Sequence, residues 1–522
     1  METGYAVETS DADPQAGSAG ALRGAPARPA LRGRVVTAAQ DSAHDEEALD
    51  LRAFLEEEEP IALLRRWFGV DALLSMSRRD ADSLRLWIDR DIAVLDRLLS
   101  EQLDAILHHR QFKELEAAWR GVMFLLDQVE GDERIIIRVL AATWKELERD
   151  FDRANEFDQS ALFAKVYSEE YGMPGGLPYG LLLCDYSVRH RQSSMEASDD
   201  IGVLSRLAEV AAASFSPCVV GAAPELFGVS TFAELSHVQS IDAGFRLAEY
   251  QRWRRLQRKE ESRFLGVTLP RILLRYLHDG REERREGFVY REQVDGIVDW
   301  LWGNAVYGFG AVAIRAFRES GWFADIRGAR ESVLTAGRVD GLPAPLFSTG
   351  ETAAYRRPLE VELTDEKQKV LEELGFIALS PCSYAKSTAF LGAQSLNVPQ
   401  MGDTAESRNA RLSSMLQYVL CVSRFAHYVK VIARDRVGSF TTAAELERLL
   451  GDWLRGYMLG NPDASSELKA RYPLSGGSVS VTELPGKPGS LACILHIEPH
   501  FQFDQIVTGL KLRTEIQATR SV

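Results

Sequence analysis

The residues best suited to chemistry are two histidines and a glutamate near the C-terminus. His496, Glu498 and His500 stand at every second position, so on a β-strand they share one face and could bind a metal ion such as zinc. No fourth ligand is evident, and polar residues on a strand face, or a histidine packed with Phe501, are more common than a metal site. We therefore interpret the three residues as a polar strand face and expect no metal.

A second pattern with chemical meaning lies in the middle of the chain. Gly308, Gly310 and Ala313 fit the loose G-x-G-x-x-A form of a dinucleotide site. They lie within an apolar helical run, however, and follow no clear strand, which favours helix packing through small residues. The patterns typical of P-loop nucleotide sites, zinc proteases and serine hydrolases do not occur in the sequence.

The other histidines and thiols give little support for catalysis. His108 and His109 are adjacent at the end of a helical pattern, so their side chains point in different directions. Cys184 and Cys493 lie in apolar strand patterns, where burial raises the pKa of a thiol. We predict that the protein is not an enzyme and needs no cofactor, and we keep a metal- or nucleotide-dependent enzyme as an alternative.

Composition narrows the classes of function further. The 522 residues include 76 acidic and 61 basic side chains, a net charge of −15, which opposes the phosphate neutralisation that nucleic-acid binding requires. The most apolar long stretch, Leu412 to Ile432, is interrupted by Arg424, His427 and Lys430, so it predicts a buried helix and no membrane insertion. Five scattered cysteines and an N-terminus without a signal-peptide pattern indicate the reducing cytoplasm.

The elements that would position these residues alternate between helix and strand. A long amphipathic helical pattern begins at Ser83. Arg134 to Leu140 (RIIIRVL) is short and dense in β-branched residues, which predicts a buried strand. Strand patterns at Tyr179 to Tyr186 and Pro217 to Ala222 flank a helical one at Ile201 to Phe215. This alternation predicts an α/β layer within a mixed, multi-domain fold.

Four segments are expected along the chain. Residues 1–48 are rich in Ala, Gly, Pro, Ser and Asp, which predicts a disordered arm. Residues 49–83 are expected to be helical and to offer a possible outer or partner-binding surface. Residues 84–400 form the expected α/β N-terminal domain, and residues 401–522 a C-terminal domain. The arm contains a basic patch, interpreted as a solvated tail or a docking arm, that consists of Arg23, Arg28, Arg32 and Arg34.

The C-terminal domain has the clearest pattern. Two helical runs are followed by a hairpin with a P-G-K-P-G turn and by a closing strand. A strand so near the terminus could pair with the sheet edge of another copy, whereas pairing within its own domain is the alternative. The candidate residues for such strands between subunits are Val479, Val481, Leu491, Cys493, Leu495, Ile497, Leu510, Leu512 and Ile516.

Several long strings resemble one protein family in their order along the chain. They include LSEQLDAILHHRQFKELEAAWRG at Leu99 to Gly121, the block from Asp150 to Tyr186, LWGNAVYGFG at Leu301 to Gly310, VSRFAHYVKVIARDRVGSF at Val422 to Phe440, and EPHFQFD at Glu498 to Asp504. These strings are similar to the large subunits of contractile type VI secretion sheaths, the TssC/VipB family. The likeness extends over about residues 95 to 516 and is poor over the first 80 or so.

The resemblance implies a set of partners. It implies a heterodimer with a small sheath subunit (TssB/VipA-like), a helical polymer of many copies around an Hcp inner tube, and a baseplate. Contraction would expel the tube, and a ClpV-type AAA+ ATPase would then dismantle the sheath; Leu49 to Val70 is the nearest helical candidate for ATPase recognition. We also keep open a sheath subunit of a different contractile device, such as a phage tail, and a static scaffold that never contracts.

Overall fold

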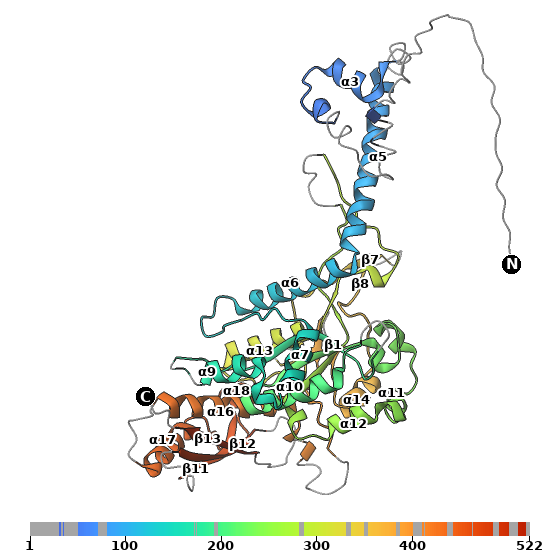
Figure 1. Ribbon diagram of the computed structural model, residues 1–522. Coiled ribbons are helices and arrows are strands. Elements are labelled where there is room, and N and C mark those ends of the chain that lie inside the picture. The colour runs from blue at the N-terminus through green and yellow to red at the C-terminus, as the bar shows by residue number, and fades with distance from the viewer. Residues whose placement is uncertain are drawn as a thin grey trace, which may run out of the picture. The chain divides into compact units, whose positions relative to one another are not determined.

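The computed structural model describes most of the chain, with gaps. Figure 1 shows the arrangement of its elements along the chain. Packing divides the chain into two units, one formed by residues 1–105 and 278–293 and the other by residues 106–277 and 294–522. The described residues are 31–32, 35, 51–70, 81–171, 173, 175–192, 197–280, 287–329, 336–348, 353–382, 387–399, 410–411, 413–435, 442–461, 463–483, 490–500 and 510–517.

The first unit is organised by a buried carboxylate on the long helix α5 (Ala81–Leu107). Asp91, only 4% exposed, accepts hydrogen bonds from Arg32 at 2.7–2.9 Å and from the indole of Trp67 at 2.9 Å. Trp67 belongs to α3 (Pro60–Phe68). Leu31 and Arg32, which we expected within a disordered arm, are helical, and Leu31 is buried. The ion pair of Arg32 with Asp91 neutralises the buried carboxylate and holds this segment in place. The rest of the expected arm lies outside the described residues, apart from residue 35.

A six-stranded sheet forms the centre of the second unit. The order is β1-β2-β3-β9-β10-β6, parallel from β1 to β9 and antiparallel from β9 to β6. Every residue of β2 and β3 is buried, whereas β1, at the edge, is largely half-buried or exposed. The strands are β1 (Leu182–Val188), β2 (Cys218–Ala222), β3 (Leu265–Leu269), β6 (Arg338–Val339), β9 (Ile377–Pro381) and β10 (Thr388–Phe390).

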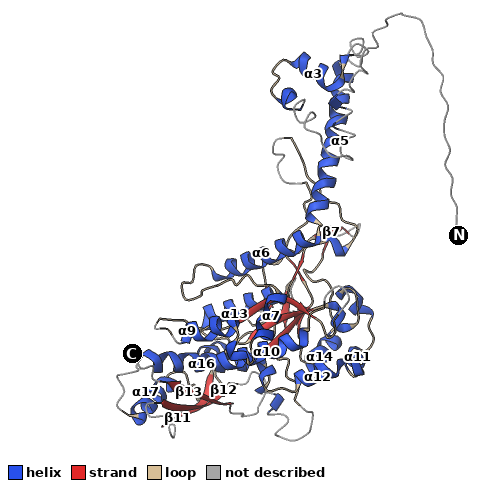
Figure 2. Ribbon diagram, in the orientation of Figure 1, coloured by secondary structure: helices blue, strands red, loops and turns tan. Residues whose placement is uncertain are grey.

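The two faces of this sheet belong to two apolar cores. Strand residues alternate between faces, so Cys218 and Val220 pack with α10 (Asp200–Ser214), while Val219 packs with α13 (Val306–Ser320). Figure 2 shows the strands among the surrounding helices. The other elements of this region are α6 (Arg110–Val129), α7 (Trp144–Arg153), α8 (Ala161–Phe163), α9 (Glu169–Tyr171), α11 (Ile241–Phe245), α12 (Gln251–Gln257), α14 (Asp365–Glu373), β4 (Ile272–Leu273), β5 (Trp302–Gly303), β7 (Leu346–Ser348) and β8 (Ala353–Tyr355).

The expected α/β layer is confirmed, with one strand prediction wrong. Helix α7 begins at the capping box that Thr143 forms with Glu146. Residues 134–140 do not form a strand, because no neighbouring strand pairs with them in the described structure. Ile136, Val139 and Leu140 are 60%, 65% and 54% exposed. β-branched residues favour an extended backbone, but a strand also needs a hydrogen-bonding partner.

The C-terminal part consists of three helices and an antiparallel sheet. Helix α16 (Leu416–Asp435), α17 (Ala443–Arg455) and α18 (Ser466–Arg471) precede β11 (Leu474–Glu483), β12 (Ser490–Pro499) and β13 (Leu510–Gln517), whose order is β11-β12-β13. Phe425, Leu450 and Cys493 lie in a third apolar core between these helices and the sheet. None of the helices in the described residues is long and apolar enough to cross a membrane.

Candidate assembly surfaces

The C-terminal sheet brings all nine candidate strand residues together. Val481 lies opposite Cys493, which in turn lies opposite Thr514, and Leu495 lies between Val479 and Leu512 in the register. Cys493, Leu495 and Ile497 are fully buried against the chain's own third core. Their side chains therefore stabilise this domain. Among the described residues β13 has no second strand partner, whereas β11 is bridged to Met458 at Leu474 and donates the Val481 N–H group to the Glu447 carboxylate. Pairing between subunits through these strands stays a prediction.

His496 of β12 lies close to a carboxylate, whereas His500 follows the strand, which ends at Pro499. The His496 imidazole is 3.2 Å from the Glu498 carboxylate, and both side chains are partly exposed. Burial lowers the pKa of His500. Across the described residues, no three His, Cys, Asp or Glu side chains converge as a metal site would require. The pair is consistent with the polar strand face that the two-residue spacing suggested.

The glycines of the loose dinucleotide pattern serve helix packing. A Cβ atom on Gly310 would lie 2.5 Å from Leu183 of β1 and 2.8 Å from Leu125 of α6. On the facing helix, a Cβ on Gly121 would lie 2.3 Å from the Tyr307 ring. The absence of a Cβ at Gly310 and Gly121 lets α6, α13 and the sheet approach closely, whereas a Cβ on Gly308 would make only ordinary contacts at 3.7 Å. The packing interpretation of this motif is thus supported at Gly310.

The cysteines show one arrangement that the sequence analysis missed. The Cys184 and Cys218 sulfurs lie 3.2 Å apart on the neighbouring strands β1 and β2. The hydrogen bond with Cys184 and burial both raise the pKa of Cys218. Burial raises the pKa of Cys493 to about 12, as expected. Both cysteines of the pair stood in consecutive predicted strands, which was the available signal for their proximity.

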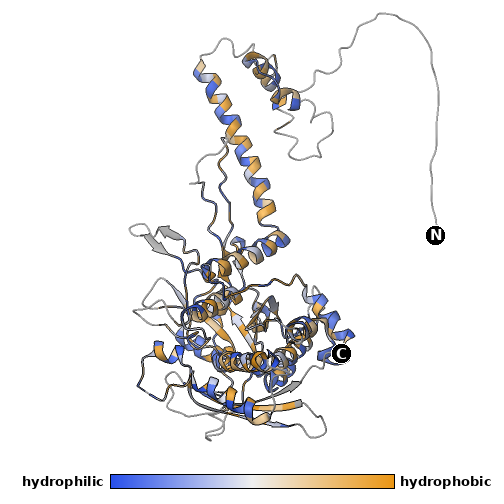
Figure 3. Cartoon of the chain, turned by 90° about the vertical axis from the view of Figure 1, so that its left-hand side faces the viewer, coloured by the Kyte–Doolittle hydropathy of each residue, from blue (hydrophilic) through white to orange (hydrophobic). Residues whose placement is uncertain are grey.

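Helix α6 carries an exposed apolar surface that the sequence analysis also missed. Its inner face packs on α13 through Gly121 and Leu125. A second apolar row at spacings of three or four residues faces outward, and exposed apolar side chains that lie next to one another are typical of a binding surface. We call this row the α6 surface; it consists of Phe112, Leu115, Trp119, Met123 and Leu126, which are 37%, 57%, 61%, 54% and 47% exposed. Figure 3 shows apolar residues along the helices of this part of the chain.

Helix α16 is held to the sheet-bearing body by a half-buried lysine and a buried histidine. The Lys430 ammonium lies 4.8 Å from the ring centroids of Tyr167 and Tyr171 and 4.9 Å from that of Phe215, an aromatic arrangement that stabilises a cation. Burial lowers the pKa of Lys430 to about 8. One turn away, burial lowers the pKa of His427 to about 3, and its ring meets the Ser214 carbonyl at 3.1 Å.

Comparison with known proteins shows the family to which this chain belongs. The family model described as VipB, tail sheath N-terminal domain, matches residues 89–397, and the tail sheath gpW/gp25-like domain model matches residues 405–516. The chain belongs to the VipB family of tail sheath proteins. The type VI secretion system sheath protein TssC1 of Pseudomonas aeruginosa is 35% identical over 440 residues, which are 83% of this chain and 86% of that protein.

Membership of the VipB family makes the chain the structural large subunit of a type VI secretion sheath, as the resemblance implied. Subunits of this family assemble with a small sheath subunit and with copies of themselves. A crystal structure of a sheath tail protein from Desulfitobacterium hafniense aligns with 60% of this chain and 59% of that chain, at 11% identity and a TM-score of 0.26. That likeness is too low to carry an argument about shape. The α6 surface and the sheet edges are thus candidate contacts in a polymer.

Proposed function

We propose that this VipB-family subunit forms a contractile sheath in the cytoplasm, around an Hcp tube and on a baseplate. Contraction expels the tube, and a ClpV-type ATPase then dismantles the sheath. The relationship to a type VI secretion sheath protein supports this assignment. Such work needs a polymer with two packings, whose energy is released when many interfaces rearrange together.

The observation that carries the proposal is the peripheral position of β13. This strand pairs with β12 over eight residue pairs and has no second strand partner among the described residues. Main-chain hydrogen bonds to an edge strand are independent of sequence, so the same β12 edge can accept β13 from another copy. Strands exchanged in this way keep copies linked while their bodies rotate.

We further propose two functional regions, residues 84–400 and 401–522. The matches of two separate family models to residues 89–397 and 405–516 support this division. The α6 surface lies in the first region and is proposed to bind the small sheath subunit. Burial of its five large apolar side chains in an interface supplies the free energy, at about 25 cal/mol per Å² of apolar surface.

An engineered disulfide tests the strand exchange. Cys493 and Thr514 are direct partners in the antiparallel register, where Cβ atoms lie about 4.5–5.5 Å apart. Mild oxidation of sheaths that contain Thr514→Cys should therefore join β12 to β13. If copies exchange strands, denaturing gels will show a ladder at multiples of 58.2 kDa; a cross-linked monomer alone would contradict the exchange.

Arg513→Cys is the matched control. Residue 513 pairs with Ile494, and successive strand residues point to opposite faces, so this cysteine cannot reach Cys493. It should give no ladder under the same oxidation. Removal of residues 510–522 should also abolish tubules in electron micrographs while the complex with the small subunit persists. Tubules that survive this truncation would exclude β13 as the link.

A further inference from the structure

A cavity of about 610 Å³ lies in the second unit where the helices of the two regions meet. Its walls come from the C-terminal end of α13, the middle of α16, the residues that follow α17 and α18, and the turn at residues 132–134. The cavity is lined by three arginines, Arg134, Arg424 and Arg471, and by several aromatic rings. This composition suits a ligand with both an acidic and an apolar part.

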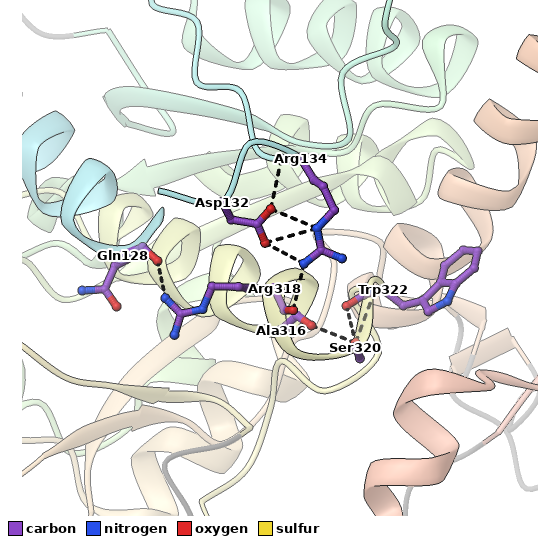
Figure 4. A network of polar contacts seen from close by, with 7 residues as sticks. All are labelled: Gln128, Asp132, Arg134, Ala316, Arg318, Ser320 and Trp322. Atoms are coloured by element: carbon purple, nitrogen blue, oxygen red, sulfur yellow. Dashed lines mark hydrogen bonds and ion pairs between the residues drawn. The ribbon is translucent and has the colours of Figure 1, made fainter. Parts of the chain in front are cut away.

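Two of the guanidinium groups meet at one aromatic ring. Arg134 and Arg424 each lie 5.8 Å from the ring centroid of Phe317. Arg134 is neutralised locally, because it pairs with Asp132 at 2.6 Å and donates to the Arg318 carbonyl at 3.1 Å. Figure 4 shows Asp132 and Arg134 beside the end of α13, from which Trp322 follows.

Arg424 has no comparable neutralisation. Its guanidinium rests on the Tyr428 ring at 4.7 Å, and the contact to the Tyr428 hydroxyl, at 3.5 Å, is at the limit of a hydrogen bond. Within the part of the chain that the structure describes, the Nε–H group is buried without an acceptor, and no carboxylate forms an ion pair with this side chain. A buried charged donor without a partner is costly. An anionic acceptor that enters the cavity would remove that cost.

The negative end of α13 disfavours a highly charged polyphosphate more strongly than a single carboxylate. Helix α13 directs its C-terminal end into the cavity wall, and Glu319 also lines the cavity. Helix C-termini carry partial negative charge, whereas phosphate groups bind at N-termini. A single carboxylate can still pair with Arg424, because one planar fork matches two oxygens. The rings of Trp322 and Tyr457 offer contacts for the apolar part of such a side chain.

We propose that this cavity, the Arg424 pocket, docks an exposed acidic side chain from a second copy of the chain. The chain has 76 acidic and 61 basic side chains, so copies that assemble repel each other on average and require local cationic sites. A half-buried arginine with a free donor meets that requirement. The inference rests on the assembly of copies within the sheath and is independent of strand exchange by β13.

Photocrosslinking from the pocket rim tests the proposal. Tyr472 lines the pocket and is 39% exposed, so Tyr472→benzoylphenylalanine should place a photoreactive ketone at its mouth. Sheaths assembled from the full chain and its small subunit should give a product of twice 58.2 kDa on irradiation. The same probe at Tyr276, which is 56% exposed and outside the pocket, is the control and should give no such product. A product with the small subunit alone, or none, would overturn the proposal.

Arginine variants show whether charge is responsible. Arg424→Gln should reduce the crosslinked product by at least about tenfold, whereas Arg246→Gln, on an exposed side chain 80% accessible, should leave it unchanged. Arg471→Gln, at the exposed rim, gives a second test if the half-buried position does not tolerate substitution. An unchanged yield in both pocket variants would refute the role of the arginines. The Thr514→Cys ladder is read separately, so failure of either proposal leaves the other distinguishable.

Discussion

Helices α6 and α16 are each 20 residues long, yet they use their apolar side chains differently. Thirteen residues of α16 are buried, against four of α6. The rest of the chain surrounds α16 on most sides, with α17 and the C-terminal sheet on one side and the Lys430 aromatic cluster on another. Helix α6 packs one face on α13 and keeps a second apolar face in solvent.

The two helices therefore differ in purpose: α16 stabilises the fold of the subunit, and α6 offers a surface for binding. An apolar helix face is stable when other elements cover it, and α16 finds this cover within one chain. The outward apolar row of α6, from Phe112 to Leu126, has no cover from the described residues and would be covered only in a complex. Substitutions in α16 should therefore change the folding of the subunit, and substitutions in the α6 surface should change what the subunit binds.

The largest effect is expected at Phe425. Its side chain is fully buried, stacks on Trp322 at 4.1 Å and contacts the Trp453 and Tyr457 rings at 5.8 Å. Phe425→Ala should lower the free energy of unfolding by about 3–5 kcal/mol, because it removes apolar contacts and leaves a cavity. Urea denaturation followed by tryptophan fluorescence measures the change. Met123→Ala on α6 is the control. An equal loss of unfolding free energy in this variant would contradict the difference between α16 and α6.

A smaller, pH-dependent effect is expected at His427. Its pKa of about 3 in the folded chain lies below the ordinary 6.5, so the unfolded chain binds more protons between these values. Stability from this group is complete above pH 6.5 and falls as the pH decreases, by about 3 kcal/mol at pH 4. His427→Gln keeps a donor for the Ser214 carbonyl without a titrating group.

Urea denaturation of both proteins at pH 4 and pH 7 checks this expectation. The variant should lose less stability than the parent between the two pH values, because its buried side chain cannot gain a proton. An equal loss of stability between pH 7 and pH 4 in the parent and the variant would show that His427 does not contribute to acid sensitivity. It would also indicate that water reaches this face of α16.

The smallest effect on stability is expected at Trp119. Its side chain is 61% exposed on the α6 surface, so Trp119→Ser should change the free energy of unfolding by no more than about 0.5 kcal/mol. The same variant should lose the small sheath subunit in affinity purification of the coexpressed pair. Leu247→Ser, at a side chain 55% exposed elsewhere, should retain it. Retention of the small subunit by both variants would exclude the α6 surface as its binding site.

Local sequence patterns were reliable where the decisive forces are local. Thr143 and Glu146 form a capping box at the start of α7, and its hydrogen bonds span only three residues. The patterns at residues 201–215 and 217–222 correspond to α10 and β2. The pattern at residues 134–140 was misleading, because β-branched composition indicates an extended backbone but does not reveal whether a second strand lies alongside.

By itself the sequence determined the order of helices and strands, the alternation that buries one face of each, and the long strings by which the family is recognised. Only the tertiary structure decided which apolar face stays in solvent on α6, that Arg32 joins Asp91, and that Arg134, Arg424 and Arg471 surround one cavity. Exposure and convergence of charge depend on contacts between residues far apart in the chain. Those contacts arise from the packing of whole elements, which short-range periodicity does not encode.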